Sequence, residues 1–196
     1  MKIGIFGGSF NPPHKMHKEI AIELIKKHYV DKVIFVPTGS KYKYKNNLLS
    51  DKVRLDMLKL MCKDTNNLEV SDYELKDDVV YTYLTLNYFK NKYKNDEIYF
   101  ICGTDNLSYI DKWKRGEYIL SNNKILVIKR NTDDINALLD KYKDYKDNII
   151  VTDIKENEIS STKIREMIYN NKRVKNYLDK SVDLYIRDNN LYKGGI

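Results

Sequence analysis

Two histidines and a glycine-rich turn near the start of the chain are the residue types of a phosphate-binding site. Residues 7–17 read Gly-Gly-Ser-Phe-Asn-Pro-Pro-His-Lys-Met-His and follow an apolar run at residues 3–6 that predicts a first β-strand. Glycines let a backbone approach an anion closely, and the first N–H groups of a helix point at it. His14 and His17 fall on one face of the helix that the following residues predict. The spacing therefore predicts phosphate binding at a strand-to-helix turn.

The same histidine pair has an alternative interpretation as half of a zinc site. Zinc needs further ligands, and the remaining histidine, His28, has no clear partner in the sequence. Cys62 and Cys102 lack the close spacing of metal-binding cysteines, so we expect both to be reduced core residues. We therefore predict no protein-bound metal at these histidines.

A run of hydroxyl residues near the end of the chain predicts a second anion site. Residues 159–165 read Ile-Ser-Ser-Thr-Lys-Ile-Arg, and Ser160, Ser161 and Thr162 are typical of a helix N-terminus. Simple N-capping needs only one serine. Lys163 and Arg165 fall in the first turn, where a cation opposes the helix dipole and a bound anion offsets that cost. Two helix N-termini, one near each end of the chain, are thus predicted to converge on one polyphosphate.

A third group of candidates follows an apolar run at residues 98–102. Gly103 permits a tight turn at the end of that predicted strand, and Asp105 either caps a helix or accepts a ribose hydroxyl. Trp113 is the only tryptophan. A lone tryptophan is either a core residue or a flat surface on which an aromatic ligand stacks. The residues alone leave both choices open.

Residues 38–48 predict an exposed basic loop in which Lys41, Lys43 and Lys45 alternate with tyrosines. Such a loop is either simply solvated or a lid that closes on phosphates. The net charge is +7 and the isoelectric point about 9.1, but the positive charge forms no long block. We therefore expect an anionic small substrate rather than nucleic acid.

The elements that must position these residues alternate between strand and helix. Short apolar runs rich in β-branched residues predict buried parallel strands at residues 3–6, 33–36, 98–102, 125–128 and 149–151. The spacing of apolar residues predicts helices at residues 17–27, 51–62, 82–93 and 134–142, with Ser50 as an N-cap. The pattern predicts an α/β fold, a single-domain, Rossmann-like, doubly wound parallel sheet over residues 1–196 with helices on both faces. Ligands of such sheets bind beyond the carboxyl ends of the strands, where residues 7–17 lie.

Size and composition are those of one globular protein. The chain has 196 residues, of which 42% are hydrophobic and 32% charged. It has no apolar run long enough for a membrane helix and no signal peptide, so we expect a cytoplasmic protein without a membrane partner. The oligomeric state is left open, with a homo-oligomer among the alternatives.

Together these motifs resemble those of the HxGH nucleotidyltransferase superfamily, and within it those of the bacterial nicotinate mononucleotide adenylyltransferases. Residues 7–17 are similar to the first motif of that family, residues 159–165 match its ISSTxIR motif, and Gly103 to Asp105 with Trp113 are similar to its central motif. Residues 54–57, Tyr81, Thr82, Arg130 and the tail from Val182 to Tyr192 also fall where the family has related residues. The resemblance spans nearly the whole chain.

The resemblance implies an adenylyl transfer in NAD biosynthesis, in which nicotinate mononucleotide attacks the α-phosphorus of ATP and pyrophosphate leaves. It implies that His14 and His17 stabilise charge on the ATP phosphates as catalytic residues. It implies ATP contacts at Gly7, Gly8, Ser9, Phe10, Gly103, Asp105, Ser160, Ser161, Thr162 and Arg165, and mononucleotide contacts at Thr82, Trp113, Lys43 and Arg130. Mg²⁺ is implied as the ion that shields the triphosphate, held mainly by ATP oxygens and water.

Two residues depart from the family pattern, and several alternatives stay open. Met16 stands where the family has glycine, and Lys114 follows Trp113 where an aromatic residue is frequent. Within the enzyme class the alternatives are a pantetheine-phosphate adenylyltransferase, a cytidylyltransferase, or an enzyme that prefers nicotinamide mononucleotide. Outside it, the alternative is a catalytically silent module that binds nucleotide or RNA. Met16 keeps this last alternative open, because its side chain either crowds the phosphates or turns away from them.

Overall fold

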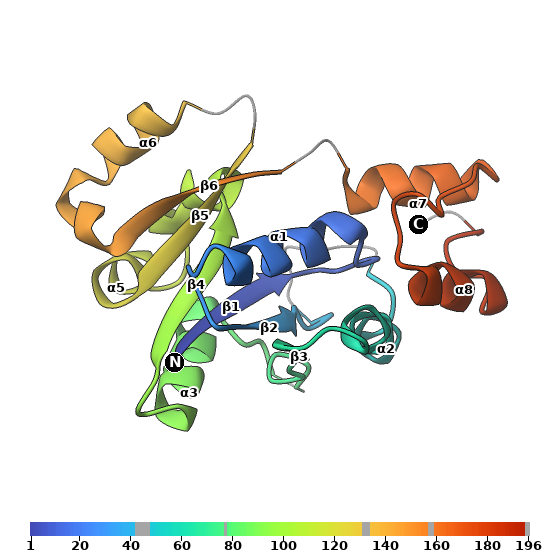
Figure 1. The fold of residues 1–196 in the computed structure, drawn as a ribbon, viewed down its shortest axis with the longest axis horizontal. Coiled ribbons are helices and arrows are strands. Elements are labelled where there is room, and N and C mark those ends of the chain that lie inside the picture. The colour runs from blue at the N-terminus through green and yellow to red at the C-terminus, as the bar shows by residue number, and fades with distance from the viewer. Residues whose placement is uncertain (42–47, 77, 131–133, 157–158, 195–196) are drawn as a thin grey trace.

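The computed structural model describes residues 1–41, 48–76, 78–130, 134–156 and 159–194, and these form an α/β fold around one parallel sheet (Figure 1). Six strands build the sheet in the order β3-β2-β1-β4-β5-β6. They are β1 (Lys2–Gly8), β2 (Lys32–Pro37), β3 (Leu68–Val70), β4 (Glu97–Gly103), β5 (Lys124–Arg130) and β6 (Ile149–Glu156). All neighbouring pairs are parallel. The predicted doubly wound sheet is confirmed.

Five of the six strands coincide with the apolar runs in the sequence, and β3 is the strand that the sequence analysis missed. It contains only Leu68, Glu69 and Val70, and it pairs with β2 at the sheet edge. Three residues are too few for a period-2 or continuous apolar pattern to emerge. Its partner strand supplies the hydrogen bonds that a short edge strand needs, so its position is decided by tertiary structure rather than by its own composition.

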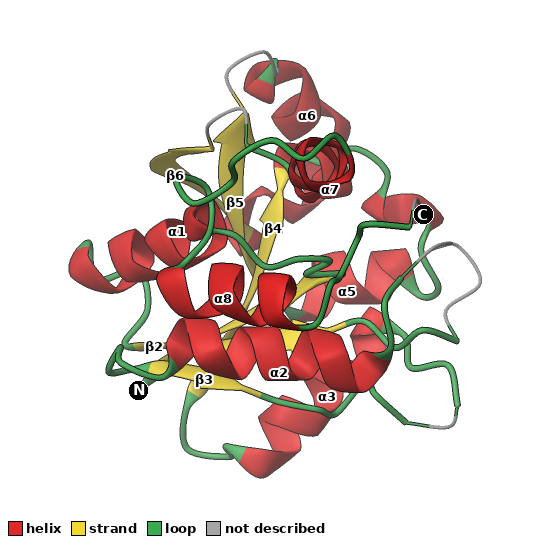
Figure 2. Ribbon diagram, turned by 90° about the vertical axis from the view of Figure 1, so that its right-hand side faces the viewer, coloured by secondary structure: helices red, strands yellow, loops and turns green. Residues whose placement is uncertain are grey.

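Helices cover both faces of the sheet (Figures 1 and 2). They are α1 (Lys15–Lys26), α2 (Asp51–Cys62), α3 (Thr82–Lys92), α4 (Thr104–Leu107), α5 (Gly116–Asn122), α6 (Ile135–Lys141), α7 (Ser161–Tyr169) and α8 (Lys180–Asp188), with 3₁₀ turns at Ile110–Lys112 and Lys143–Asn148. One apolar core lies between the sheet and α1, α2, α7 and α8. The second core lies against the opposite face, under α3, α4 and α5. Alternate residues of each central strand feed the two cores, as the pleat requires.

The helix boundaries follow local capping chemistry. The Ser50 hydroxyl accepts a 3.5 Å hydrogen bond from the Val53 N–H, which confirms the predicted N-cap of α2. Asp134 caps α6 in the same way, since its carboxylate accepts from the N–H groups of Asn136 and Ala137. Helix α1 begins at Lys15, two residues before the predicted start, because His14 holds the extended backbone of an N-cap position (φ −134°).

The sheet order places the functional segments at one edge. Strand β1 lies between β2 and β4, so the chain runs outward in one direction through β3 and in the other through β6. This reversal beside β1 is the topological switch point, where ligands of open α/β sheets bind beyond the carboxyl ends of the strands. Residues that follow β1 and β4 therefore face the same crevice.

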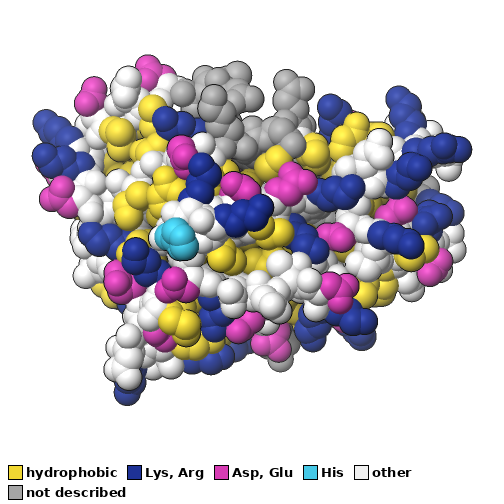
Figure 3. Space-filling view, in the orientation of Figure 1, with side chains coloured by type: hydrophobic (Ala, Val, Ile, Leu, Met, Phe, Trp, Pro, Cys, Tyr) yellow, Lys and Arg dark blue, Asp and Glu magenta, His cyan; other side chains and the backbone are white. Residues whose placement is uncertain are grey.

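The C-terminal helix is tied to the core on the α1 and α2 side. Helix α8 runs alongside α2 (Figure 2), and the Ser181 hydroxyl donates a 3.2 Å hydrogen bond to the Leu60 carbonyl. Lys18 of α1 forms a 3.1 Å ion pair with Asp179, just before α8. Lys and Arg side chains gather over α7 and α8, at the right-hand end of the face in Figure 3. None of the described helices is both long and apolar enough to cross a membrane.

Candidate active site

The turn after β1 brings its backbone close to aromatic side chains and to the crevice. Phe10 adopts a left-handed backbone (φ 47°), and its side chain is buried in the core. A Cβ on Gly8 would lie 3.0 Å from the Phe10 ring, whereas a Cβ on Gly7 would meet nothing within 4 Å. A side chain on Gly8 would therefore press against the Phe10 ring, while Gly7 leaves open space at the crevice. Phe10 contributes backbone to this turn, and its ring belongs to the core.

The two histidines stack on each other at the N-terminus of α1. Their ring centroids are 3.7 Å apart with an interplanar angle of 23°, and the His17 ring also meets the edge of Phe10 at 5.0 Å. The His14 backbone N–H donates a 3.1 Å hydrogen bond to His17 Nδ1. Since Nδ1 accepts, the neutral His17 ring carries its hydrogen on Nε2 and presents that N–H as a donor.

Burial favours the neutral form of both imidazoles. It lowers the pKa of His14 to about 4, and His14 Nδ1 is buried without a hydrogen-bond partner among the described residues. Burial, and secondarily the charge of His14, lowers the pKa of His17 well below its usual value. An anion placed beside the rings would favour the protonated forms, because an opposite charge offsets the desolvation cost. The pair is thus suited to respond to bound phosphate.

Helix α7 docks its N-terminus directly onto this turn. The Ser161 hydroxyl donates a 2.8 Å hydrogen bond to the Pro12 carbonyl, and Arg165 Nη1 donates to the Asn11 carbonyl at 2.9 Å. Ser160 caps the helix, since its hydroxyl accepts a 3.2 Å bond from the Lys163 N–H. The predicted meeting of the two helix N-termini is therefore present in the structure, although the two segments are more than 140 residues apart (161 − 12 = 149).

Asn11 is a connecting residue that the sequence analysis did not single out. Its side-chain oxygen accepts a 2.9 Å hydrogen bond from the Tyr192 hydroxyl and a 3.3 Å bond from the Leu49 N–H. Asn11 is buried, at 2% exposure. A buried amide needs such partners, because an unsatisfied polar group inside the protein is costly. In the sequence, the sign of this role is a polar residue that stands between Phe10 and two prolines.

Arg54 holds the turn at residues 7–17 in place through hydrogen bonds from its side chain. Its side chain is fully buried (0% exposed), and its Nη1 donates a 2.9 Å hydrogen bond to the Ser9 carbonyl. Its Nε donates to the Leu49 carbonyl at 3.0 Å, and Nη2 pairs with Asp51. A buried guanidinium persists only when its donors are satisfied, so this network fixes the position of the Ser9 backbone.

Met16 turns its side chain into the core. It is 6% exposed and belongs to the apolar cluster beneath α1 with Ile20, Ala21 and Leu24. The thioether therefore packs away from the stacked histidines rather than occupying the space in front of them. A flexible, unbranched side chain suits such an irregular core position. The departure from glycine at this position is accommodated within the hydrophobic core.

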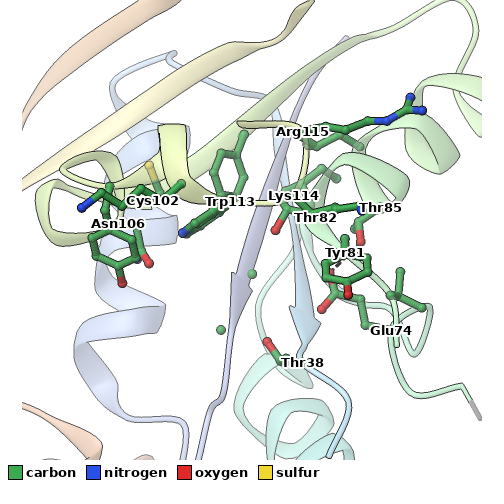
Figure 4. Close-up of a pocket in the computed structure, with 18 residues that line it drawn as sticks. Thr38, Glu74, Tyr81, Thr82, Thr85, Cys102, Asn106, Trp113, Lys114 and Arg115 are labelled. Carbon is green, nitrogen blue, oxygen red and sulfur yellow. Dashed lines mark hydrogen bonds between the residues drawn. The ribbon is translucent and has the colours of Figure 1, made fainter. Parts of the chain in front are cut away.

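A large cavity opens on the other side of the same turn. Its volume is about 830 Å³, and Gly7 and Gly8 line it together with Thr82 and Trp113. In Figure 4, Trp113 stands on one side, and Tyr81, Thr82 and Thr85 stand on the other. Trp113 is partly exposed, and its ring meets the edges of Phe100 and Tyr109 at centroid distances of 6.2 Å. Trp113 therefore packs partly against the core, and its exposed part faces the cavity.

The cavity walls carry both signs of charge. Glu74 is buried at 8% exposure and accepts a 2.6 Å hydrogen bond from the Thr85 hydroxyl. Lys114 and Arg115 line the cavity from the turn before α5, where Arg115 has a left-handed backbone (φ 56°). The Arg115 guanidinium lies 5.1 Å from the centre of the Tyr83 ring. Glu74, Thr85 and Arg115 were missed from the sequence, because chain segments far apart supply them.

Gly103 and Asp105 lie at the same sheet edge but outside the cavity lining, which includes their neighbours Cys102 and Asn106. Gly103 ends β4 and is the N-cap of α4, with an extended backbone (φ −79°) that does not itself require glycine. A Cβ on Gly103 would collide with the Asp105 carboxylate. A side chain at this position would require the Asp105 carboxylate to move. Asp105 lies inside α4 and is not its N-cap, which removes one of its two predicted roles.

The structure gives only partial information on three basic residues that the sequence suggests as phosphate or mononucleotide contacts. Lys41 is exposed between β2 and α2, and Lys43 lies outside the described residues. Arg130 is the last residue of β5, and its side chain lies outside the described part. Within the described chain, no group of three or more His, Cys, Asp or Glu side chains is arranged to hold a metal ion.

Comparison with known proteins agrees with this architecture. A model of the cytidylyltransferase-like family matches residues 5–167. A curated relative from Clostridium beijerinckii, named probable nicotinate-nucleotide adenylyltransferase, is 38% identical, and the match covers 98% of this chain and 99% of that protein. A protein of the same name from Clostridium botulinum (strain Alaska E43) is 40% identical, with 98% of each chain covered.

A solved structure has the same fold. It is the nicotinic acid mononucleotide adenylyltransferase of Plasmodium falciparum complexed with NaAD, with a TM-score of 0.83, 21% identity and 97% of each chain covered. At that identity the likeness concerns the fold. The sequence relationships with the clostridial proteins carry the assignment further: the chain belongs to the cytidylyltransferase-like nucleotidyltransferases and, among them, to the nicotinate-nucleotide adenylyltransferase family.

Proposed function

We propose that this protein joins ATP and nicotinate mononucleotide to form nicotinate adenine dinucleotide and pyrophosphate, as part of NAD biosynthesis. The observation that carries the proposal is the meeting of two helix N-termini, α1 and α7, at a turn that also lines the 830 Å³ cavity. Helix N-termini attract phosphate. A cavity beside them with an accessible indole suits a mononucleotide that carries a flat ring.

In this reaction a phosphate oxygen of the mononucleotide forms a bond to the α-phosphorus of ATP, and the bond to pyrophosphate breaks. The attacking phosphate is already ionised at neutral pH, so no general base is required. The protein then contributes chiefly by positioning the reactants and by stabilising charge. That fits a site whose conspicuous side chains are donors rather than a nucleophile with its base.

We assign the phosphate side of the site to the turn and the two helices. His17 presents its Nε2–H to the triphosphate, and His14 stacks beside it. Ser161, Thr162 and Arg165 bind the outer phosphates from α7, and Gly7, Gly8, Ser9 and Phe10 supply backbone. Gly103 and Asp105 address the adenosine from the end of β4. Ser160 has a separate structural role as helix cap.

Mg²⁺ accompanies the triphosphate in this proposal. Phosphate oxygens and water, the ligands that Mg²⁺ prefers, would hold the ion. When bound, it neutralises charge on the phosphates. The protein would then bind the Mg²⁺-bound nucleotide through hydrogen-bond donors.

We assign the acceptor to the cavity. Trp113 stacks on the pyridine ring, and Thr82 lies on the opposite wall. Lys114 supplies positive charge at the wall, which favours the carboxylate of nicotinate over the neutral amide of nicotinamide, whereas the Arg115 guanidinium is directed towards Tyr83. Lys43 and Arg130 stay weaker candidates for contacts with the mononucleotide.

The test is a pyrophosphate-release assay with ATP and each of three acceptors: nicotinate mononucleotide, nicotinamide mononucleotide and 4′-phosphopantetheine. The proposal predicts turnover with nicotinate mononucleotide and a kcat/KM ratio that favours it over the amide. Turnover with phosphopantetheine alone would contradict the assigned acceptor. ATP binding without pyrophosphate release from any acceptor would instead support the silent module.

A further inference from the structure

A second cavity lies at the opposite end of α7 from the proposed phosphate site. Its volume is about 540 Å³, and it is formed by the end of α7, residues 171–175, α8 and the residues that follow α8. It shares no lining residue with the acceptor cavity. Small-molecule pockets generally measure roughly 300–1,000 Å³, so this one has room for one ligand of about mononucleotide size.

The floor of this cavity is apolar. It consists of Ile168, Val174 and Ile186, which are 9%, 6% and 2% exposed, together with the partly buried Leu191. These residues belong to the core between α7, α8 and the sheet. Because these side chains are already mostly buried, a ligand that covers them gains only from the small apolar surface that is still exposed.

The rim of the same cavity is strongly basic. It carries Lys172, Arg173, Lys175, Arg187 and Lys193, with Asp183 as the one acidic residue in the lining. Arg187 pairs with Asp183 at 3.3 Å, and Lys193 donates a 2.8 Å bond to Asn190. The other three cations of the lining form no ion pair with any described residue. The rim therefore has at least three positive charges without a counter-ion in the described chain.

The backbone that holds these cations is fixed by two helix-terminal turns. Asn171 is left-handed (φ 54°), and the Lys172 N–H donates a 2.7 Å bond to the Met167 carbonyl at the end of α7. Asn190 is also left-handed (φ 50°), and the Leu191 N–H donates to the Ile186 carbonyl at 3.0 Å. Such capped helix ends fix the backbone that carries these residues, so that binding has only their side chains left to order.

From this combination we infer that the cavity binds an organic anion, one with a compact apolar body for the floor and at least one phosphate or sulfonate group for the rim. An inorganic anion alone would leave the floor exposed, and a neutral apolar molecule would leave the cations unused. Lys and Arg bind such groups through charge-assisted hydrogen bonds, which are stronger than neutral ones. The adenylyl-transfer assignment is not needed for this conclusion.

The cavity also adjoins the elements that support the turn at residues 7–17. Leu191 precedes Tyr192, whose hydroxyl bonds to Asn11. On the other wall, the Lys15 side chain donates to the Lys175 carbonyl at 3.3 Å, and the Lys15 N–H donates to the Tyr177 carbonyl at 2.9 Å. A ligand in this cavity thus contacts two segments that hold the start of α1 and the proposed phosphate turn.

The test uses 8-anilinonaphthalene-1-sulfonate, an apolar ring system with one sulfonate, titrated by fluorescence and calorimetry into the full-length protein. The rim variant is Lys172→Glu with Arg173→Glu, and its matched control is Lys94→Glu with Lys143→Glu, which changes the net charge equally at exposed positions outside both cavities. Arg165→Ala serves as the variant of the proposed ATP site. We expect the rim variant to bind about tenfold or more weakly, the loss of one charge-assisted hydrogen bond. The other two variants should bind as the wild type does.

Loss of binding in Arg165→Ala but not in the rim variant would overturn the inference, as would equal binding in all four proteins. If the rim variant fails to fold, hydrogen exchange of the wild-type protein with and without the probe replaces it. Protection confined to residues 168–175 and 186–193 supports the site, and no protection there overturns it. A loss of self-association in the rim variant during sedimentation would also overturn it, because the cavity would then be a contact between copies of the chain.

Discussion

The two halves of the proposed active site are built differently. The phosphate turn is held by hydrogen bonds from α2, α7 and the C-terminal tail, through Arg54, Ser161, Arg165 and Tyr192. The acceptor cavity is instead a wide space whose principal aromatic residue, Trp113, is only partly buried against the core and meets Phe100 and Tyr109 edge-on. Preorganised donors matter most where charge develops, whereas an adaptable cavity discriminates by shape and charge. Substitutions in the turn should therefore affect stability and kcat, and those in the cavity should affect KM and selectivity.

The largest effect should come from Arg54 beneath the phosphate turn. Arg54→Met removes the donors to Ser9 and Leu49 and leaves Asp51 without its buried partner. We expect the free energy of unfolding to fall by about 3 kcal/mol or more in urea denaturation. Lys52→Met on the same helix is the control, because that side chain is 82% exposed and its surface ion pair contributes little. Equal losses of stability in the two variants would show that Arg54 does not hold the turn.

The buried histidines should make stability depend on pH. The His14 pKa is about 4 in the folded protein, below its usual value of 6.5, so the unfolded chain binds more protons between these two values. Unfolding free energy should therefore fall as pH drops from 6.5 to 4, by about 3 kcal/mol in total for His14. His14→Asn should flatten this part of the curve. His28→Asn is the control substitution, because His28 is exposed and its left-handed backbone (φ 56°) suits asparagine.

A smaller effect, of a different kind, is expected in the cavity. Trp113→Ala removes the stacking surface, so KM for nicotinate mononucleotide should rise about tenfold while kcat changes less. Steady-state kinetics with saturating ATP measures both parameters. Tyr169→Ala, at an exposed position (57%) on α7 outside this cavity, should leave both unchanged. A fall in kcat alone would assign Trp113 to the phosphate half instead.

The smallest effect should be on substrate selectivity at Lys114. This exposed cation lines the cavity, and its charge is screened by solvent. Lys114→Ala should reduce the preference for nicotinate over nicotinamide mononucleotide by about two- to fivefold in kcat/KM. Lys94→Ala is the matched control outside the cavity. An unchanged ratio would leave Arg115 as the remaining positive charge to test at that wall.

The same contrast explains what the sequence could predict. Strand-turn-helix order, the N-cap at Ser50 and a helix N-terminus at residues 160–162 follow from local patterns, and the composition of the two helix N-termini predicted that they meet. Strand β3 did not, because it has three residues and depends on β2. The phosphate half of the site could be predicted from the sequence because helix N-termini have a recognisable composition.

Most residues of the acceptor cavity could not be predicted from local sequence patterns. Glu74 and Thr85 form a buried pair eleven residues apart, and neither lies in a motif of its own. Arg115 reaches the wall through a left-handed backbone that nothing in its residue type predicts. Met16 shows the converse: the sequence marks it as a departure, but only the packing shows that its side chain joins the core. Side-chain direction depends on tertiary contacts, which a single sequence does not specify.

The most direct test of preorganised charge stabilisation is the kcat of His17→Asn compared with His17→Ala. Asparagine can still accept the bond from the His14 N–H that His17 Nδ1 now accepts, but it lacks the Nε2 donor. Both variants should lose about 100-fold or more in kcat with nicotinate mononucleotide, with little change in KM for that substrate. A near-normal kcat in either folded variant would contradict the role of His17 as the donor to the triphosphate.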